Sequence, residues 1–156
     1  MTQYEKLLEE ATQSGLNILE NYDLSGTKIK GLYCDGTIAL SNDLHTDADR
    51  LSILYEEIGH HNTSVGNILD LHDTSSCKQE LRARIDAYNN AIGLDGLKDA
   101  LLSGISSFAE LADYFEVTEE FLLEALTYYK SKYGTFTTIE KKYVLCFEPL
   151  GILELI

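Results

Sequence analysis

The sequence predicts an α+β fold that is mainly helical, and three observations support this class. Apolar residues recur every three or four positions over most of the chain, which is the spacing of one helix face. Pairs of Ser or Thr with Glu or Gln precede several of these stretches at the spacing of helix capping boxes. Two short apolar segments are interrupted by turn residues and predict two small β-hairpins. The length favours a single domain over residues 1–156.

The N-terminal segment predicts a helix followed by a hairpin. Thr2 and Glu5 form a capping box, and the apolar residues after them continue at helical spacing to about residue 20. Residues 29–40 alternate around Asp35-Gly36, a pair that favours a type I′ turn.

Two longer helices are predicted next. Thr46 and the acidic residues that follow it suit the positive end of a helix dipole, so we expect a helix over about 47–61. Residues 62–75 are polar and predict a loop. A second helix is expected over 76–92.

The C-terminal part predicts three short helices and a closing hairpin. The helices are expected within about 94–133, and the hairpin within about 143–156. Pro149 at the second position of a turn and Gly151 at the fourth favour a type I turn between the two strands.

The charge of the chain limits the classes of partner. Twelve basic against 26 acidic residues give a formal net charge of −14. Such a chain is repelled by nucleic-acid phosphates and by anionic membranes, so we expect no direct nucleic-acid binding and no membrane binding. The acidity either keeps the protein soluble or forms a surface for a basic partner or a DNA-like surface.

Cysteine usage and the N-terminal residues indicate a cytoplasmic protein. Cys34, Cys77 and Cys146 are odd in number and widely spaced, which suits a reducing compartment. The first residues show neither the basic nor the apolar region of a signal peptide, and no apolar run is long enough to cross a bilayer.

One stretch carries a pattern typical of metal chemistry. In the H-E-x-x-H motif, residues i and i+4 share a helix face and hold a metal, while the intervening Glu acts as general base on a water molecule. Here Glu57 and His60 occupy the base and second-ligand positions, and Glu56 stands at the first-ligand position. A carboxylate can bind a divalent cation, so a site is still expected, although the same pattern also occurs as an ordinary ion pair on a helix surface.

A third ligand is expected from the helix at 76–92, because a metal site needs at least three protein ligands. Ala83 and Ala87 form a smooth face that allows close packing against another helix, and Glu80 lies on that face one turn earlier. Asp86 is the fallback ligand. The alternative is that Glu80 pairs with Arg84 at i+4.

The other histidines have simpler interpretations. His61 points about 100° around the helix from His60 and is expected to compensate the dipole at the helix end. His72 could bind metal or substrate, but a solvated loop residue is the simpler reading, and His45 also looks like a loop residue. No Ser-His-Asp or Cys-His pairing and no Gly-rich phosphate loop is readable.

Together these residues resemble a known family. The order of helix, hairpin, Glu57-Ile58-Gly59-His60 and the segment from Glu80 to Ala87 is similar to the ImmA/IrrE-type metallopeptidases, and most closely to short forms from phages and mobile elements. The resemblance covers most of residues 1–133. It implies a zincin-like motif helix.

The resemblance also implies a function. Members are zinc-dependent and cut, or otherwise relieve, a helix-turn-helix repressor encoded nearby. By this resemblance Glu57 is the general base, and Glu56, His60 and Glu80 hold zinc or another divalent cation. Glu56 replaces the first His of the motif, which adds negative charge and weakens the preference for zinc. Two hypotheses follow: a metalloendopeptidase that acts on a partner repressor, or a catalytically inactive module that binds its partner stoichiometrically.

One further segment resembles a helix-turn-helix. Residues 108–122 have the right turn spacing, but the helix in the recognition position begins Thr-Glu-Glu, which repels phosphate. We interpret it as a packing unit, with a protein-binding face as the functional alternative.

Overall fold

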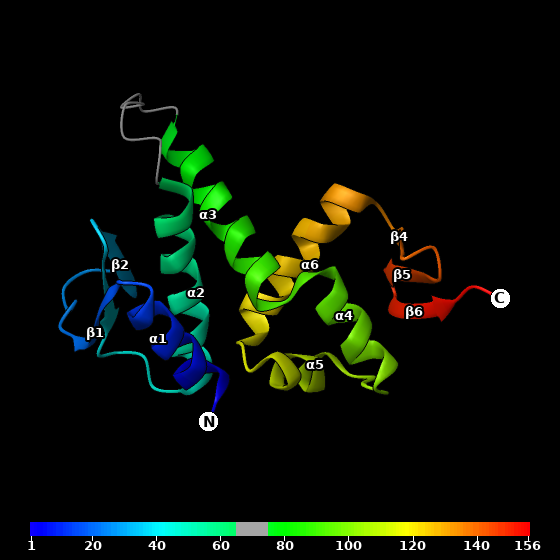
Figure 1. Cartoon of the computed structure of the whole chain (residues 1–156), viewed down its shortest axis with the longest axis horizontal. Helices are drawn as coiled ribbons and strands as arrows, with labels where there is room; N and C mark the ends of the chain where they lie inside the picture. The colour runs from blue at the N-terminus through cyan, green and yellow to red at the C-terminus, as the bar shows by residue number, and fades with distance from the viewer. Residues whose placement is uncertain (65–74) are drawn as a thin grey trace. The chain divides into compact units, whose positions relative to one another are not determined.

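The computed structural model describes residues 1–64 and 75–156, with the side chains of residues 75 and 76 left out. Within that range it contains six helices and two three-stranded sheets (Figure 1). The chain divides into two compact units, Met1–Asn90 and Ala91–Ile156. The α+β, mainly helical class is therefore confirmed, whereas the single domain over 1–156 stays a prediction.

The first unit begins with helix α1 (Gln3–Gln13), and the predicted capping box is present. Thr2 accepts a hydrogen bond from the backbone of Glu5, whose side chain accepts one in return. The expected extension of this helix to residue 20 is wrong. Gly15 adopts a left-handed conformation with φ of 101°, which ends the helix, and the chain continues into strand β1 (Asn17–Tyr22).

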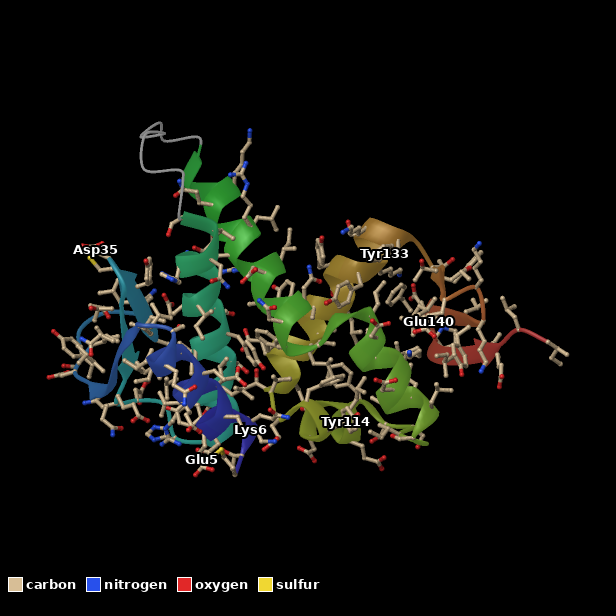
Figure 2. The ribbon with its side chains drawn as sticks, viewed as in Figure 1. Glu5, Lys6, Asp35, Tyr114, Tyr133 and Glu140 are labelled. Carbon is tan, nitrogen blue, oxygen red and sulfur yellow. The ribbon has the colours of Figure 1, made fainter. Side chains whose placement is uncertain are left out.

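Strand β1 belongs to a sheet with the predicted hairpin. Strands β2 (Gly31–Cys34) and β3 (Thr37–Ser41) are antiparallel, and β1 pairs with β3 in parallel, which gives the order β1-β3-β2. Both turn residues between β2 and β3 have positive φ, as a type I′ turn requires, and Asp35 lies at the tip (Figure 2). Strand β2 is thus an edge strand, and α2 packs against it.

Helices α2 (Asp47–Ser64) and α3 (Ser75–Ala91) are the two helices predicted to carry the site. Helix α2 extends past the expected end at 61, so the first three residues of the predicted loop are helical. The last residue of that loop, 75, begins α3, and residues 65–74 lie outside the described residues. Figure 1 shows α2 and α3 side by side, which the close approach of Gly59 to Ala83 supports.

The second unit contains the three predicted short helices, α4 (Gly93–Leu102), α5 (Phe108–Phe115) and α6 (Glu119–Tyr133). Ser107 and Thr118 cap α5 and α6 by accepting hydrogen bonds from backbone N–H groups. A sheet follows with the order β4-β5-β6, from β4 (Phe136–Ile139), β5 (Tyr143–Phe147) and β6 (Leu150–Glu154). The closing hairpin was therefore expected, whereas β4 was not.

The predicted type I turn is in the wrong register. Phe147 pairs with Leu150, so the strands enclose a two-residue loop, Pro149 is its last residue, and Gly151 lies within β6. The register follows from burial, because this pairing places Leu145 and Phe147 in the core of the unit. None of the described helices is long and apolar enough to cross a membrane.

Candidate metal and proton-transfer site

Helix α2 is anchored by its start and by its apolar face. Thr46 and Asp49 exchange hydrogen bonds as a capping pair, with each side chain accepting from the other residue's backbone N–H. Leu51 and Leu54 are almost fully buried in the core of the unit. The same helix then places Glu57 at 8% exposure, a burial that few carboxylates share.

The contact between α2 and α3 depends on a glycine. A Cβ on Gly59 would lie 2.2 Å from the backbone oxygen of Ala83, so only glycine fits at this point of contact. Ala83 and Ala87 are both fully buried. The small-residue face predicted for α3 is thus the face that packs on another helix, and it carries Glu80 toward α2.

His60 and Glu80 meet across this contact. His60 Nε2 lies 3.2 Å from Glu80 Oε2, and the His60 and Glu80 side chains are 28% and 46% exposed. The other oxygen, Oε1, lies 3.4 Å from Nε of Arg84. Glu80 thus forms the predicted pair with Arg84 and also faces His60, while its role as a metal ligand stays a prediction.

Glu57 lies against the edge strand of the first sheet. A Cβ on Gly31 of β2 would lie 2.9 Å from Oε1 of Glu57, so the missing side chain at residue 31 makes room for the carboxyl group. Burial, the charge of Glu56 and the charge of Glu80, in that order, raise the pKa of Glu57 to about 7. A carboxyl group with such a pKa exchanges protons at neutral pH, as a general base or acid must.

Glu56 and Asp86 have different surroundings. Glu56 is partly buried and close enough to raise the pKa of Glu57. Asp86, the fallback ligand, accepts hydrogen bonds from the side-chain amides of Asn62 and Asn90 at 2.9 and 3.1 Å. The carboxylate of Asp86 thus contacts these two amides, whereas Glu80 contacts His60 and Arg84.

The remaining histidines fall in three places. His61 lies in the last turn of α2, and its Nδ1 is 2.8 Å from the hydroxyl of Tyr33 on β2. His45 is exposed and lies 3.2 Å from Asp43. His72 lies outside the described residues.

The contact between Tyr33 and His61 was not predicted, although a signal for it was present. Residues 31 and 33 point to one face of β2, and residues 57 and 61 lie one turn apart on α2. The strand therefore lays Gly31 over Glu57 and Tyr33 over His61. The sequence shows the two-residue repeat of the strand and the helical repeat of α2 separately. Only the packing of α2 on β2 shows which residues of the two elements face each other.

The spacing of the donor atoms bears on whether they could hold a divalent metal. Two ligand atoms held by one tetrahedral zinc ion at about 2.0–2.2 Å lie roughly 3.3–3.6 Å apart. The 3.2 Å between His60 Nε2 and Glu80 Oε2 is close to that separation. Within 1–64 and 75–156, however, no three His, Cys, Asp or Glu side chains group as metal ligands. His60 and Glu80 therefore fit as a pair, and Glu56 as third ligand stays a prediction.

Comparison with known proteins shows the family of this chain. Residues 11–127 match the family model Peptidase_M78, described as the IrrE N-terminal-like domain. The chain belongs to this family. Its fold is accordingly metallopeptidase-like, as the sequence motif predicted. No curated protein and no solved structure matched the chain.

Proposed function

We propose that this chain is a cytoplasmic metallopeptidase-like regulator that relieves a partner helix-turn-helix repressor by hydrolysing one of its peptide bonds. The observation that carries the proposal is the burial of Glu57 beside His60 and Glu80, on a helix pair of the metallopeptidase family. A buried carboxyl group is costly to keep unless its chemistry is used. The repressor as target is proposed from the family resemblance.

In this proposal each residue has a separate role. Glu56, His60 and Glu80 would hold zinc or another divalent cation, which when bound polarises the scissile carbonyl group. Glu57 accepts a proton from the attacking water at a carboxylate oxygen and then returns it to the leaving amine. Arg84 holds the second oxygen of Glu80 and so orients that carboxylate.

The second candidate is a catalytically inactive module that binds the same repressor stoichiometrically. Two observations favour it: Glu56 stands at the first-ligand position, and Glu80 is shared with Arg84. Burial, and after it the charges of Glu56 and Glu80, raise the pKa of Glu57, which in a metal-free protein stabilises the neutral and inactive form.

The substitution Glu57→Gln separates the two candidates. It nearly preserves the size of the side chain, so partner binding should be unchanged, while repressor cleavage should fall by roughly 100-fold or more. Gel analysis of the repressor chain after incubation with metal-loaded protein measures cleavage, and a pull-down measures binding. Glu9→Gln, on the exposed face of α1, is the matched control.

The two candidates give different outcomes. If wild-type protein and Glu57→Gln relieve the repressor equally while its chain stays full length, hydrolysis is excluded and the binding module remains. If neither protein binds the repressor, both candidates fail, because each requires that partner.

Direct DNA binding is not part of the proposed function. Residues 107–132, which include the helix-turn-helix-like pair α5 and α6, contain six acidic and two basic side chains. We expect no gel shift of duplex DNA at physiological salt. A tight and salt-sensitive shift by the isolated protein would contradict this part of the proposal.

A further inference from the structure

The second unit contains an apolar groove that the proposed site does not use. It has a volume of about 710 Å³ and is formed by the end of α4, by α5 and α6 and by β5 and β6, all within residues 101–152. Phe108 and Leu111 line it from α5, Leu123 and Leu126 from α6, and Leu150 from the sheet. Figure 2 shows side chains of this unit, including Tyr114 on α5 and Tyr133 at the end of α6.

The side chains that α6 contributes are at the spacing of one helix face. Leu123, Leu126, Thr127 and Lys130 follow at i, i+3, i+4 and i+7. Leu123 is 59% exposed, although its neighbour Leu122 is fully buried. The core of the unit is thus complete without Leu123, whose apolar surface faces solvent inside the groove, where a covering partner would remove it from water.

Acidic side chains flank the groove, although the two charged residues of its lining, Lys130 and Glu148, balance each other. The only basic side chain that lines it within the described residues is Lys130, and Lys130 forms an ion pair with Glu148. Glu119 and Glu120 are exposed in the first turn of α6, one turn before Leu123. A basic segment is therefore attracted to the groove, while a second copy of this acidic chain is repelled from it.

We propose that this groove is a docking site for an amphipathic helix of a protein partner, with apolar residues on one face and Lys or Arg beside them. The lining offers mainly aliphatic and aromatic side chains, and the hydroxyl of Ser107 already caps α5. A helix satisfies its own backbone hydrogen bonds and needs only apolar contact and charge, which are what the groove supplies. The inference is independent of the proposed function, because it involves neither Glu57 nor a metal.

A pair of synthetic peptides tests the chemistry of the occupant. One peptide of about 16 residues carries Leu at i, i+3, i+4 and i+7 with Lys at the flanking positions, and the other has Glu in place of Lys. Fluorescence polarisation with the full chain should show binding of the basic peptide at least tenfold tighter than of the acidic one. The affinity should fall between 50 and 300 mM salt, and circular dichroism should show a gain of helix on binding.

Two variants locate the binding. Leu123→Ala removes an exposed side chain in the groove and should weaken the basic peptide about tenfold without loss of folding. Leu102→Ala, on α4 outside the groove and also exposed, is the matched control and should leave the affinity unchanged.

Several results would overturn the docking proposal. These are equal affinity for both peptides, no effect of Leu123→Ala, a gain of β-structure on binding, or a dimer of the chain that Leu123→Ala dissociates. Equal affinity would show that charge does not select the partner, and an unaffected Leu123→Ala would show that the peptide binds elsewhere. A gain of β-structure would mean that the occupant is a strand, and a dimer would mean that it is a second copy of the chain. None of them bears on Glu57→Gln, so this proposal and the proposed function fail separately.

Discussion

Helices α2 and α6 begin alike and differ on their buried faces. Each starts after a capping threonine and carries two acidic residues in its first turn. The buried residues of α6 are apolar or aromatic, from Phe121 to Tyr129, whereas α2 also buries Ser52 and Glu57. The residues that start a helix therefore do not predict which side chains the helix buries.

The buried side chains of the two helices affect the stability of the fold in opposite ways. Burial of Leu122 removes apolar surface from water and stabilises the second unit. Burial of Glu57 opposes folding when the carboxyl group is charged. Such a residue is a candidate for chemistry because the fold does not need its charge. Four predictions test this contrast, from the largest expected effect to the smallest.

Leu122→Ala should have the largest effect. Leu122 is fully buried in α6, so truncation leaves a cavity and should lower the free energy of unfolding by about 3 kcal/mol. Leu123→Ala, one residue later and exposed, should change it by less than about 0.5 kcal/mol. Urea unfolding of both variants measures the difference, and equal losses would show that the assigned inner face of α6 is wrong.

Gly59→Ala should loosen the contact of α2 with α3. Its Cβ would lie 2.2 Å from a backbone oxygen, so the helices must move apart, and we expect a loss of about 2 kcal/mol. Gly151→Ala is the control, since no atom lies within 4 Å of its added Cβ. Thermal unfolding compares the two. A neutral Gly59→Ala would mean that α2 and α3 do not pack at this point.

Glu57→Gln should change how stability depends on pH in chelator-treated protein. The pKa of Glu57 is raised from 4.5 to about 7, so the folded state favours the neutral carboxyl group. Below pH 4.5 the carboxyl group is protonated in both states and has no effect. From pH 4.5 to 7 the wild type loses stability that the variant keeps, at a rate of up to about 1.4 kcal/mol per pH unit.

Urea unfolding of wild type and Glu57→Gln at pH 4, 5.5 and 8 measures this difference, in which the contributions of groups that do not interact with Glu57 cancel. A difference that does not change with pH would show that the buried carboxyl group titrates normally.

Thr46→Ala and Thr118→Ala should have small and similar effects. Each threonine caps its helix through one side-chain hydrogen bond to a backbone N–H at 3.0–3.1 Å. Loss of either cap should cost about 1 kcal/mol in urea unfolding. Markedly unequal losses would show that the two helix starts are not equivalent, which would weaken the comparison of their buried faces.

Features set by local chemistry were predictable from the sequence. The capping box at Thr2, the type I′ turn at Asp35-Gly36 and the starts of α5 and α6 each depend on a few neighbouring residues. The alanine face of α3 was also readable, since Ala83 and Ala87 recur at one helical turn. The candidate residues Glu57, His60 and Glu80 were named on this basis.

Other features required contacts between segments distant in sequence. Residues 17–20 continue a helical pattern, but parallel pairing with β3 makes them a strand. The register of the last hairpin depends on which side chains the core accepts, not on Pro149 alone. The contact of Tyr33 with His61 exists only because β2 lies on α2.

For the candidate site, the sequence by itself determined which groups are present: the histidine at residue 60, the carboxyl groups of Glu56, Glu57 and Glu80, and a glycine at residue 59. The tertiary structure decided the state of those groups. Gly31 on a neighbouring strand makes the room in which Glu57 is buried, and the Gly59 contact brings Glu80 within 3.2 Å of His60. Burial and charge from other segments shift a pKa, and the order of residues along the chain does not contain those distances.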